Sequence, residues 1–237
     1  MIPDFVHAAI DRLGVDVDDK MLGVMARYLD LLDQANQRFN LTGIRNRDEM
    51  WRLHIVDRLT LLPWIEDSSE KKIIDVGSGG GVPGIPVAIA RSDLRVTLLD
   101  ATTKKARFCQ ECIDALELAQ VDVVNERAET IGQCPDHRQR YDAAACRALG
   151  PMRESLEYTL PLVRIGGTVL AMKGPKAEAE LAGAADAMHL LGAGDLEVVD
   201  AYPPGFDQNK VIVVIGKARA TPPQYPRPPG MPRQSPL

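Results

Sequence analysis

The feature that most constrains the fold is a glycine-rich segment that directly follows a short apolar run. Residues 72–76 (KIIDV) have the length and composition of a buried strand, and residues 77–84 (GSGGGVPG) lead into an apolar stretch, 84–91, that we expect to be helical. Glycines let the chain turn tightly between a strand and a helix, and they let the backbone approach a ligand closely. The segment therefore predicts a ligand-binding loop at the carboxyl end of the first strand of an α/β sheet.

Strands and helices alternate after this loop. Further strands are predicted at 96–100, 121–124, 143–146 and 168–172, and helices at 103–118, 151–162 and 176–191. Such alternation implies right-handed crossovers and a parallel sheet with helices on both faces. The last two runs, 196–199 and 211–215, are joined by a loop containing Pro203, Pro204 and Gly205 that is too short for a crossover helix, so these strands must be antiparallel. We expect an α/β, Rossmann-like fold whose seven-stranded sheet is mostly parallel with a reversed last strand.

The two ends of the chain differ from this middle part. Residues 22–32 repeat leucine and methionine at three- and four-residue spacing, which is typical of an amphipathic helix. Residues 222–237 contain seven prolines and would be interpreted, on composition alone, as a disordered tail. We therefore predict a helical N-terminal extension (1–66), an α/β core (67–220) and a Pro-rich basic C-terminal tail (221–237).

Composition indicates a soluble cytoplasmic protein. No apolar run is long enough to span a bilayer, no signal peptide precedes the first helix, and four cysteines are too few for a disulfide scaffold. Cys109 and Cys112 lie within one predicted helix without a second ligand pair, so we expect no metal site. Nothing in the sequence indicates a subunit interface or a membrane contact, and we expect a monomer.

The charge distribution favours a localised anionic partner. The net charge of −5 argues against a protein that coats nucleic acid unspecifically, yet residues 208–237 hold five basic residues and no acid. Phosphate binding needs local positive potential rather than a basic total. We expect Lys217, in this basic stretch, to contribute to RNA binding.

The glycine loop fits two cofactor classes. Gly79, Gly81 and Gly84 also match a dinucleotide fingerprint. Asp75, two residues before Gly77, suits the amino group of S-adenosylmethionine but would repel a pyrophosphate. A short-chain dehydrogenase of this length would need a Tyr-x-x-x-Lys pair, and none of the five tyrosines has lysine four residues later. Together with the reversed strand pair, these features favour a class I methyltransferase fold over an oxidoreductase.

The second predicted strand ends in Asp100, which we expect to bind the ribose hydroxyls of the cofactor in either class.

The region after the fourth strand restricts the methyl acceptor. Residues 146–151 (CRALGP) lack the Asn/Asp-Pro-Pro-aromatic motif of exocyclic amine methylation, and Cys146 in a small apolar strand is typical of a core residue rather than a nucleophile. Guanine N7 has a free lone pair and no proton, so its attack on a sulfonium methyl needs no general base. Arg147 and Lys173, as catalytic candidates that supply position and electrostatics, are compatible with this acceptor without requiring it.

A set of short motifs, in one order along the chain, resembles the bacterial ribosomal small subunit methyltransferase G family (RsmG, also called glucose-inhibited division protein B). The motifs are NLT at 40–42, HIVD at 54–57, DVGSGGGVPGIP at 75–86, RAE at 127–129, RA at 147–148, KG at 173–174 and YPRPPGMP at 225–232. Each is weak alone, whereas the ordered set is specific and covers essentially the whole chain, including the tail.

This resemblance implies N7 methylation of one guanosine in 16S rRNA of the small ribosomal subunit, with S-adenosyl-L-methionine as cofactor. It implies that Gly77, Val82, Ala128, Glu129 and, at the methyl-transfer end, Arg147 contact the cofactor, in addition to Asp75, Gly79 and Asp100 of the glycine-loop region and the second strand. RNA contacts are expected from Asn40, Arg58, Lys173, Arg227 and Arg233. The tail becomes an ordered strap near the site with Arg227 facing RNA. The chain departs from the family at Val82, usually aromatic, and at Arg58, usually serine.

Two alternatives remain open at this point: a nicotinamide-dependent reductase, and a non-catalytic RNA-binding module on the same scaffold. His54 and Asp57 lie one helical turn apart, so their side chains can share a face. We interpret them as a structural link between the N-terminal helices and the catalytic core rather than as a metal or acid–base pair.

Overall fold

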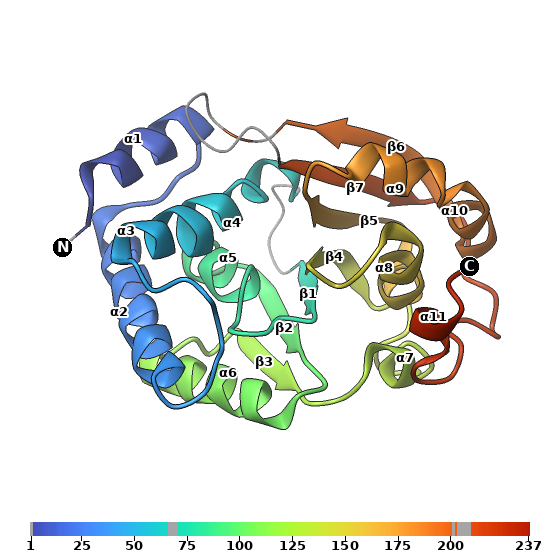
Figure 1. The fold of residues 1–237 in the computed structure, drawn as a ribbon, viewed down its shortest axis with the longest axis horizontal. Coiled ribbons are helices and arrows are strands. Elements are labelled where there is room, and N and C mark those ends of the chain that lie inside the picture. Colours follow the sequence, from blue (N-terminus) through green and yellow to red (C-terminus); the bar gives the residue numbers. More distant parts are fainter. Residues whose placement is uncertain (1, 66–70, 201, 203–209) are drawn as a thin grey trace.

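The computed structural model describes residues 2–65, 71–200, 202 and 210–237. Figure 1 shows a central sheet with helices on both faces, and the N-terminal helices form one side of the molecule. The strands follow the order β3-β2-β1-β4-β5-β7-β6. Their bounds are β1 (Lys72–Val76), β2 (Arg95–Leu99), β3 (Val121–Val124), β4 (Tyr141–Arg147), β5 (Val163–Lys173), β6 (Ala193–Val199) and β7 (Val211–Lys217).

The predicted sheet is confirmed. Strands β1 to β5 pair in parallel, while β7 runs antiparallel to both β5 and β6. The fourth and fifth strands are longer than expected, because Tyr141 pairs with Val163 beyond a register shift that contains Asp142. Its carboxylate accepts hydrogen bonds from Lys72 N at 2.8 Å and from Arg164 Nε at 2.8 Å. The loop at Pro203, Pro204 and Gly205 lies outside the described residues.

Helices form in each of the predicted stretches, and further short helices form at 128–131 and 231–234. Their bounds are α1 (Asp4–Leu13), α2 (Asp19–Asn36), α3 (Arg47–Met50), the π-helix η1 (Trp51–Val56), α4 (Asp57–Leu59), the 3₁₀ helix η2 (Leu62–Trp64), α5 (Gly84–Ala90), α6 (Thr103–Leu116), α7 (Ala128–Ile131), α8 (Met152–Thr159), α9 (Ala177–Ala182), α10 (Ala185–Leu191) and α11 (Met231–Gln234). The single helix expected at 176–191 is two helices, interrupted at Gly183, a residue of low helix propensity. In the described part of the chain, no helix is long and apolar enough to cross a membrane.

Each face of the sheet has its own hydrophobic core. One core joins the N-terminal helices to α5, α6 and alternate strand residues such as Ile73 and Leu98. The other packs α8 and α10 against the intervening residues, such as Ile74 and Leu99. This alternation is the period-two pattern of a sheet buried on both faces.

The N-terminal extension also supports the glycine loop directly. Helix α2 begins at an N-cap, Asp18, whose carboxylate accepts a hydrogen bond from Met21 N at 2.7 Å. Its buried stripe includes Tyr28, and the Tyr28 hydroxyl donates to Gly80 O at 2.6 Å. The N-terminal extension therefore holds the glycine loop in place through this hydrogen bond.

The Pro-rich tail packs as a strap against α7 and α8 (Figure 1). Arg138 donates to carbonyl oxygens of Thr221, Pro222 and Tyr225 at 2.7–3.2 Å. The Gln133 amide donates to two further tail carbonyls. Because prolines have no N–H group, the tail cannot pair as a strand, and these side-chain donors bond its carbonyl oxygens instead. The prediction of a disordered tail, made from composition alone, is therefore wrong, and the prediction of an ordered strap is confirmed.

Lys217 corrects one expectation. Its side chain is buried at the end of β7, where the ammonium donates to Leu160 O and Val163 O at 2.6 Å each. Lys217 is therefore unable to contact RNA at the surface. Burial, with a smaller contribution from Arg138, lowers the pKa of Lys217 from near 10.5 to about 7.

This pKa shift predicts a pH-dependent stability. Between pH 7 and 10.5 the unfolded chain holds the Lys217 proton and the folded chain does not, so stability rises with pH in that window and is flat below it. We expect a gain of about 1–2 kcal/mol from pH 7 to pH 9, measured by urea unfolding. Lys217→Met removes the titrating group and should flatten this gain. An equal gain in the variant would contradict the assignment.

Candidate active site

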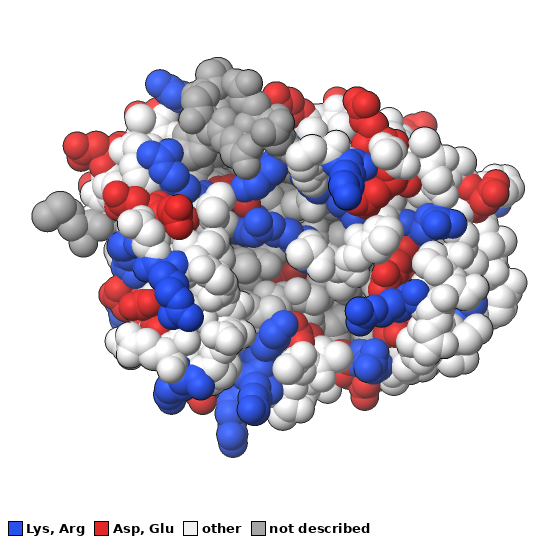
Figure 2. Space-filling model, in the orientation of Figure 1, with Lys and Arg blue, Asp and Glu red and all other residues white. Residues whose placement is uncertain are grey.

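Two adjoining pockets lie at the carboxyl ends of the parallel strands. Figure 2 shows the centre of this face hollowed, with Lys and Arg side chains around the rim. Leu149 lines the first pocket, while its neighbours Ala148 and Gly150 line the second. The turn after β4 therefore separates the two pockets.

The first pocket has a volume of about 240 Å³. It is lined by Val76, Gly77, Leu99, Asp100, Ala101, Arg127, Ala128, Glu129, Leu149, Glu154, Tyr158 and Arg233. Four of the predicted cofactor residues come together here, from the loops after β1, β2 and β3. Asp75, on β1, and Gly79 and Val82, in the adjoining loop, stand outside this lining.

The glycine loop brings the ends of β1 and β4 into close approach. Gly77 has φ 76°, in the region that favours glycine, and a Cβ atom there would lie 2.7 Å from Leu149 Cδ1. Gly77 N donates to Leu99 O at 2.8 Å, and Gly79 N donates to Asp100 Oδ2 at 2.9 Å. A side chain at Gly77 would therefore adopt a strained backbone conformation and displace the Leu149 side chain, which lines the first pocket.

Asp75 lies beneath the loop rather than on the pocket surface. Its Oδ2 accepts from Gly84 N at 2.9 Å, while Oδ1 has no partner among the described residues. Burial raises the pKa of Asp75 to about 7, opposed by the Gly84 hydrogen bond. One N–H group at the start of α5, that of Gly84, is thus satisfied by the Asp75 side chain. Contact between Asp75 and the cofactor amino group stays a prediction.

Asp100 and Glu129 are almost buried and already hydrogen-bonded to backbone. Asp100, 8% exposed, accepts from Thr102 N at 2.7 Å through Oδ1 and from Gly79 through Oδ2. Glu129 Oε1 accepts from Gly230 N of the tail at 2.9 Å. Each carboxylate keeps further lone pairs for a ligand, and both are fixed in place by neighbouring chain segments.

The second pocket, of about 260 Å³, contains both predicted catalytic residues. It is lined by Arg147, Ala148, Gly150, Met172, Lys173, Gly174, Glu180, Tyr202 and Lys210. Lys173 Nζ donates to Gly150 O at 2.7 Å and pairs with Glu180 at 2.9 Å. Arg147 keeps about a third of its side chain exposed. Lys173 therefore fixes the turn after β4, and Arg147 is the more accessible cation.

Asp57 connects the N-terminal extension to the catalytic side of the sheet. Its carboxylate accepts from Arg58 Nη1 and from the Tyr202 hydroxyl, and it lies 3.7 Å from Arg147 Nη1 and 3.5 Å from Lys210 Nζ. The predicted structural link is confirmed for Asp57. The RNA contact expected from Arg58 is wrong, because its side chain is wholly buried in this cluster.

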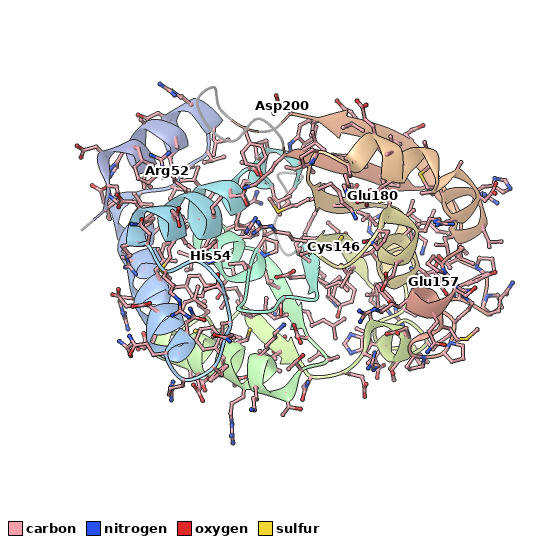
Figure 3. The ribbon with its side chains drawn as sticks, viewed as in Figure 1. Arg52, His54, Cys146, Glu157, Glu180 and Asp200 are labelled. Carbon is pink, nitrogen blue, oxygen red and sulfur yellow. The ribbon has the colours of Figure 1, made fainter. Side chains whose placement is uncertain are left out.

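His54 lies in the π-helix η1, a local distortion often found at functional sites, and its hydrogen-bond partner belongs to the N-terminal extension. In Figure 3, His54 projects from the N-terminal helices on one side of the centre and Cys146 lies on the other. His54 Nε2 lies 3.0 Å from Thr42 Oγ1. Burial, and then Arg147, lower the pKa of His54 to about 4. The imidazole is therefore neutral at pH 7.

The remaining RNA candidates occupy different positions. Asn40 is exposed in the loop between α2 and α3. Arg233 is exposed on α11 but lines the first pocket. Arg227 donates to both oxygens of Glu157, which Figure 3 shows beside the tail, so most of its hydrogen-bonding capacity is used internally. Their contacts with RNA remain predictions.

Among the polar lining residues of the two pockets, sequence reasoning missed Glu154, Tyr158, Glu180, Tyr202 and Lys210. Glu154 and Tyr158 come from one face of α8, and Tyr202 and Lys210 flank the segment between β6 and β7. None belongs to a recognisable motif. The spacing of Glu154 and Tyr158, one helical turn apart at the carboxyl edge of the sheet, was the only available signal.

Cysteine chemistry and metal binding receive no support from the described residues. Cys146 is buried in β4, and burial raises the pKa of its thiol to about 12, as expected for a core residue. Cys109 and Cys112 are buried free thiols. In the parts of the chain that the structure describes, no group of three or more His, Cys, Asp or Glu residues is placed to hold a metal ion.

The fold is similar to solved methyltransferase structures. A predicted O-methyltransferase from Agrobacterium tumefaciens matches with a TM-score of 0.54 and 23% identity, covering 68% of this chain and 82% of the other. M. jannaschii TYW2, solved in complex with AdoMet, matches with a TM-score of 0.52 and 14% identity, covering 70% and 75%. At these identities the likeness shows the fold alone.

Sequence relatives are closer. Proteins named ribosomal RNA small subunit methyltransferase G are 38% identical in Moorella thermoacetica, over 94% of this chain and 93% of the relative, and 40% identical in Chloroflexus aggregans, over 94% and 93%. The family model described as rRNA small subunit methyltransferase G matches residues 21–207. On these matches, the chain belongs to the rRNA small subunit methyltransferase G family.

Proposed function

We propose that this chain transfers the methyl group of S-adenosyl-L-methionine to N7 of a guanosine in 16S rRNA of the small ribosomal subunit. The observation that carries the proposal is the pair of pockets separated only by the turn that follows β4. One pocket carries the glycine loop and the carboxylates, and the other carries Arg147 and Lys173. A methyl donor and an acceptor base can meet across Leu149.

The first pocket fits the cofactor. The close approach at Gly77 leaves no room for a Cβ atom, and Asp100 at the end of β2 has spare acceptor lone pairs for ribose hydroxyls. Ala128 and Glu129, after β3, would hold the adenine edge, and Gly79, Val82 and Asp75 would act through the loop. When bound, the cofactor supplies an electrophilic methyl group on a sulfonium.

The second pocket suits an acceptor that needs no proton removed. The carboxylate in its lining, Glu180, is paired with Lys173, and the low pKa of nearby His54, about 4, makes its imidazole a weak base. Guanine N7 attacks through its lone pair, so position and electrostatics are sufficient. Arg147 can donate a single hydrogen bond to guanine O6, an acceptor that guanidinium groups favour, and so leave N7 free to react.

Methyl transfer to a defined substrate tests this function. Small subunits from a strain without its own N7 enzyme are incubated with labelled S-adenosylmethionine and the chain, followed by nucleoside analysis. Label recovered as 7-methylguanosine is the expected result. RNA binding without methyl incorporation into either subunits or naked rRNA would instead support a non-catalytic RNA-binding module, and tight NADH binding would support a reductase.

Arg147→Ala is expected to lower methyl transfer about tenfold, or about 1.4 kcal/mol of transition-state stabilisation. The loss is moderate because the side chain is partly exposed and N7 attack involves no proton transfer. Single-turnover rates on small subunits provide the measurement. Arg95→Ala, at the opposite end of β2, is the matched control and should react at the wild-type rate. Equal methyl-transfer rates for both variants would show that Arg147 does not take part in the reaction.

We also propose that the chain acts as a cytoplasmic monomer. In this proposal residues 1–66 support the loop and the acceptor side, 67–220 hold the cofactor, and 221–237 close the first pocket. Asn40, Lys173, Arg227 and Arg233 remain the proposed RNA contacts.

A further inference from the structure

We propose that Glu154 compensates the positive charge of the cofactor sulfonium, so that the chain distinguishes S-adenosylmethionine from its neutral product, S-adenosylhomocysteine. This inference rests on the proposed function and assigns a role to a residue on α8, outside every motif described above.

Glu154 is held against the turn after β4. It lies in the first turn of α8, is 7% exposed and lines the first pocket. A Cβ atom on Gly150 would lie 2.5 Å from Glu154 Oε2, and Gly150 has φ 123°. The carboxylate therefore packs directly on a residue that only glycine suits, and Lys173 fixes that residue through its carbonyl oxygen.

The charge of Glu154 is only partly compensated. Its Oε1 accepts a hydrogen bond from the Tyr158 hydroxyl at 3.0 Å. Burial, followed by this hydrogen bond, raises the pKa of Tyr158, so the hydroxyl stays protonated as a donor. Among the described residues, no basic side chain forms an ion pair with Glu154, whereas neighbouring Glu157 is paired with Arg227. An almost buried carboxylate without a cation is costly, and a cationic ligand would offset that cost.

The position of Glu154 in the pocket indicates which part of the ligand it faces. Asp100, Ala128 and Glu129 come from the loops after β2 and β3 and would take the ribose and adenine. Glu154 instead stands beside the Leu149 turn, which leads to the second pocket. The transferable methyl must point toward that pocket, so the sulfur that carries it lies on the Glu154 side.

The reaction changes this attraction. The N7 lone pair forms the new N–C bond, the S–C bond breaks, and its electron pair remains on sulfur. The positive charge thereby moves from the sulfonium to the guanine ring. The thioether product then has no charge for Glu154 to attract, which favours release of S-adenosylhomocysteine and its replacement by fresh cofactor.

Isothermal titration of the full chain with each ligand tests the assignment without using activity. Glu154→Gln keeps the size of the side chain and removes its charge. We expect S-adenosylmethionine to bind about tenfold more weakly, or about 1.4 kcal/mol, while S-adenosylhomocysteine binds within about twofold of wild type. Glu126→Gln, an exposed carboxylate on the loop after β3, is the control with the same change in net charge and should leave both affinities unaltered.

A second variant separates the charge from folding defects. Tyr158→Phe removes the hydroxyl that shares the Glu154 charge, so the ratio of the two affinities should stay at or above that of wild type. Equal weakening of both ligands by Glu154→Gln, or no change in either, would overturn the proposal. Failure of the wild-type chain to bind either ligand would instead overturn the proposed cofactor.

Discussion

Replacing Asp57 with alanine is expected to destabilise the chain by about 3–5 kcal/mol, the usual cost of leaving one partner of a buried ion pair alone. The group left without its partner is the guanidinium of Arg58, a residue whose side chain is wholly buried. Asp57 also accepts from Tyr202 and lies within 4 Å of Arg147 and Lys210, so its loss loosens the junction between α4 and the sheet. Urea unfolding, followed by far-UV circular dichroism, gives the free energy.

Two companion variants make this result specific. Asp48→Ala removes an exposed carboxylate from α3 and should change stability by less than about 0.5 kcal/mol. Asp57→Ala combined with Arg58→Met removes both buried charges, and it should recover a large part of the loss because the uncompensated cation is gone. A single variant no less stable than Asp48→Ala, or a double variant with no recovery, would contradict the role of this cluster.

The sheet and the glycine loop could be predicted because their signals are local. Buried parallel strands appear as short apolar runs, and the positive φ of Gly77 is a requirement that the residue type itself reveals. Asp100 could be placed near the loop since parallel strands end at one edge of the sheet, whereas Glu129, in α7, was placed there by the family resemblance. These predictions needed the order of the elements but no side-chain contacts.

Buried charges could not be predicted in this way. Arg58 and Lys217 were expected at the surface because basic side chains usually lie there. Their burial depends on partners that are remote in sequence or hidden in backbone: Tyr202 reaches Asp57 across 145 residues, and Lys217 donates to two carbonyl oxygens. Glu154 could not be predicted for a related reason. Its proposed role depends on the fact that, among the described residues, no basic side chain forms an ion pair with it.

The tail supplies the second large expected effect. Arg227→Ala leaves Glu157, whose side chain is wholly buried, without the guanidinium and is expected to cost about 3 kcal/mol. Arg227 donates to Glu157 through its backbone N at 2.9 Å, Nε at 2.9 Å and Nη2 at 2.7 Å. Loss of the two side-chain bonds should release the strap that brings Gly230 N to Glu129 and Arg233 to the first pocket.

This release should weaken cofactor binding as well as stability. We expect S-adenosylhomocysteine to bind about tenfold more weakly to Arg227→Ala, and limited proteolysis to remove the tail faster than in wild type. Arg219→Ala, which loses one exposed contact with His189 O just before the strap, is the matched control and should bind as wild type. If Arg227 instead serves only RNA, Arg227→Ala will keep its cofactor affinity and protease resistance while RNA affinity falls. A tail that stays protected in Arg227→Ala would therefore show that Arg138 and Gln133 alone hold the strap in place.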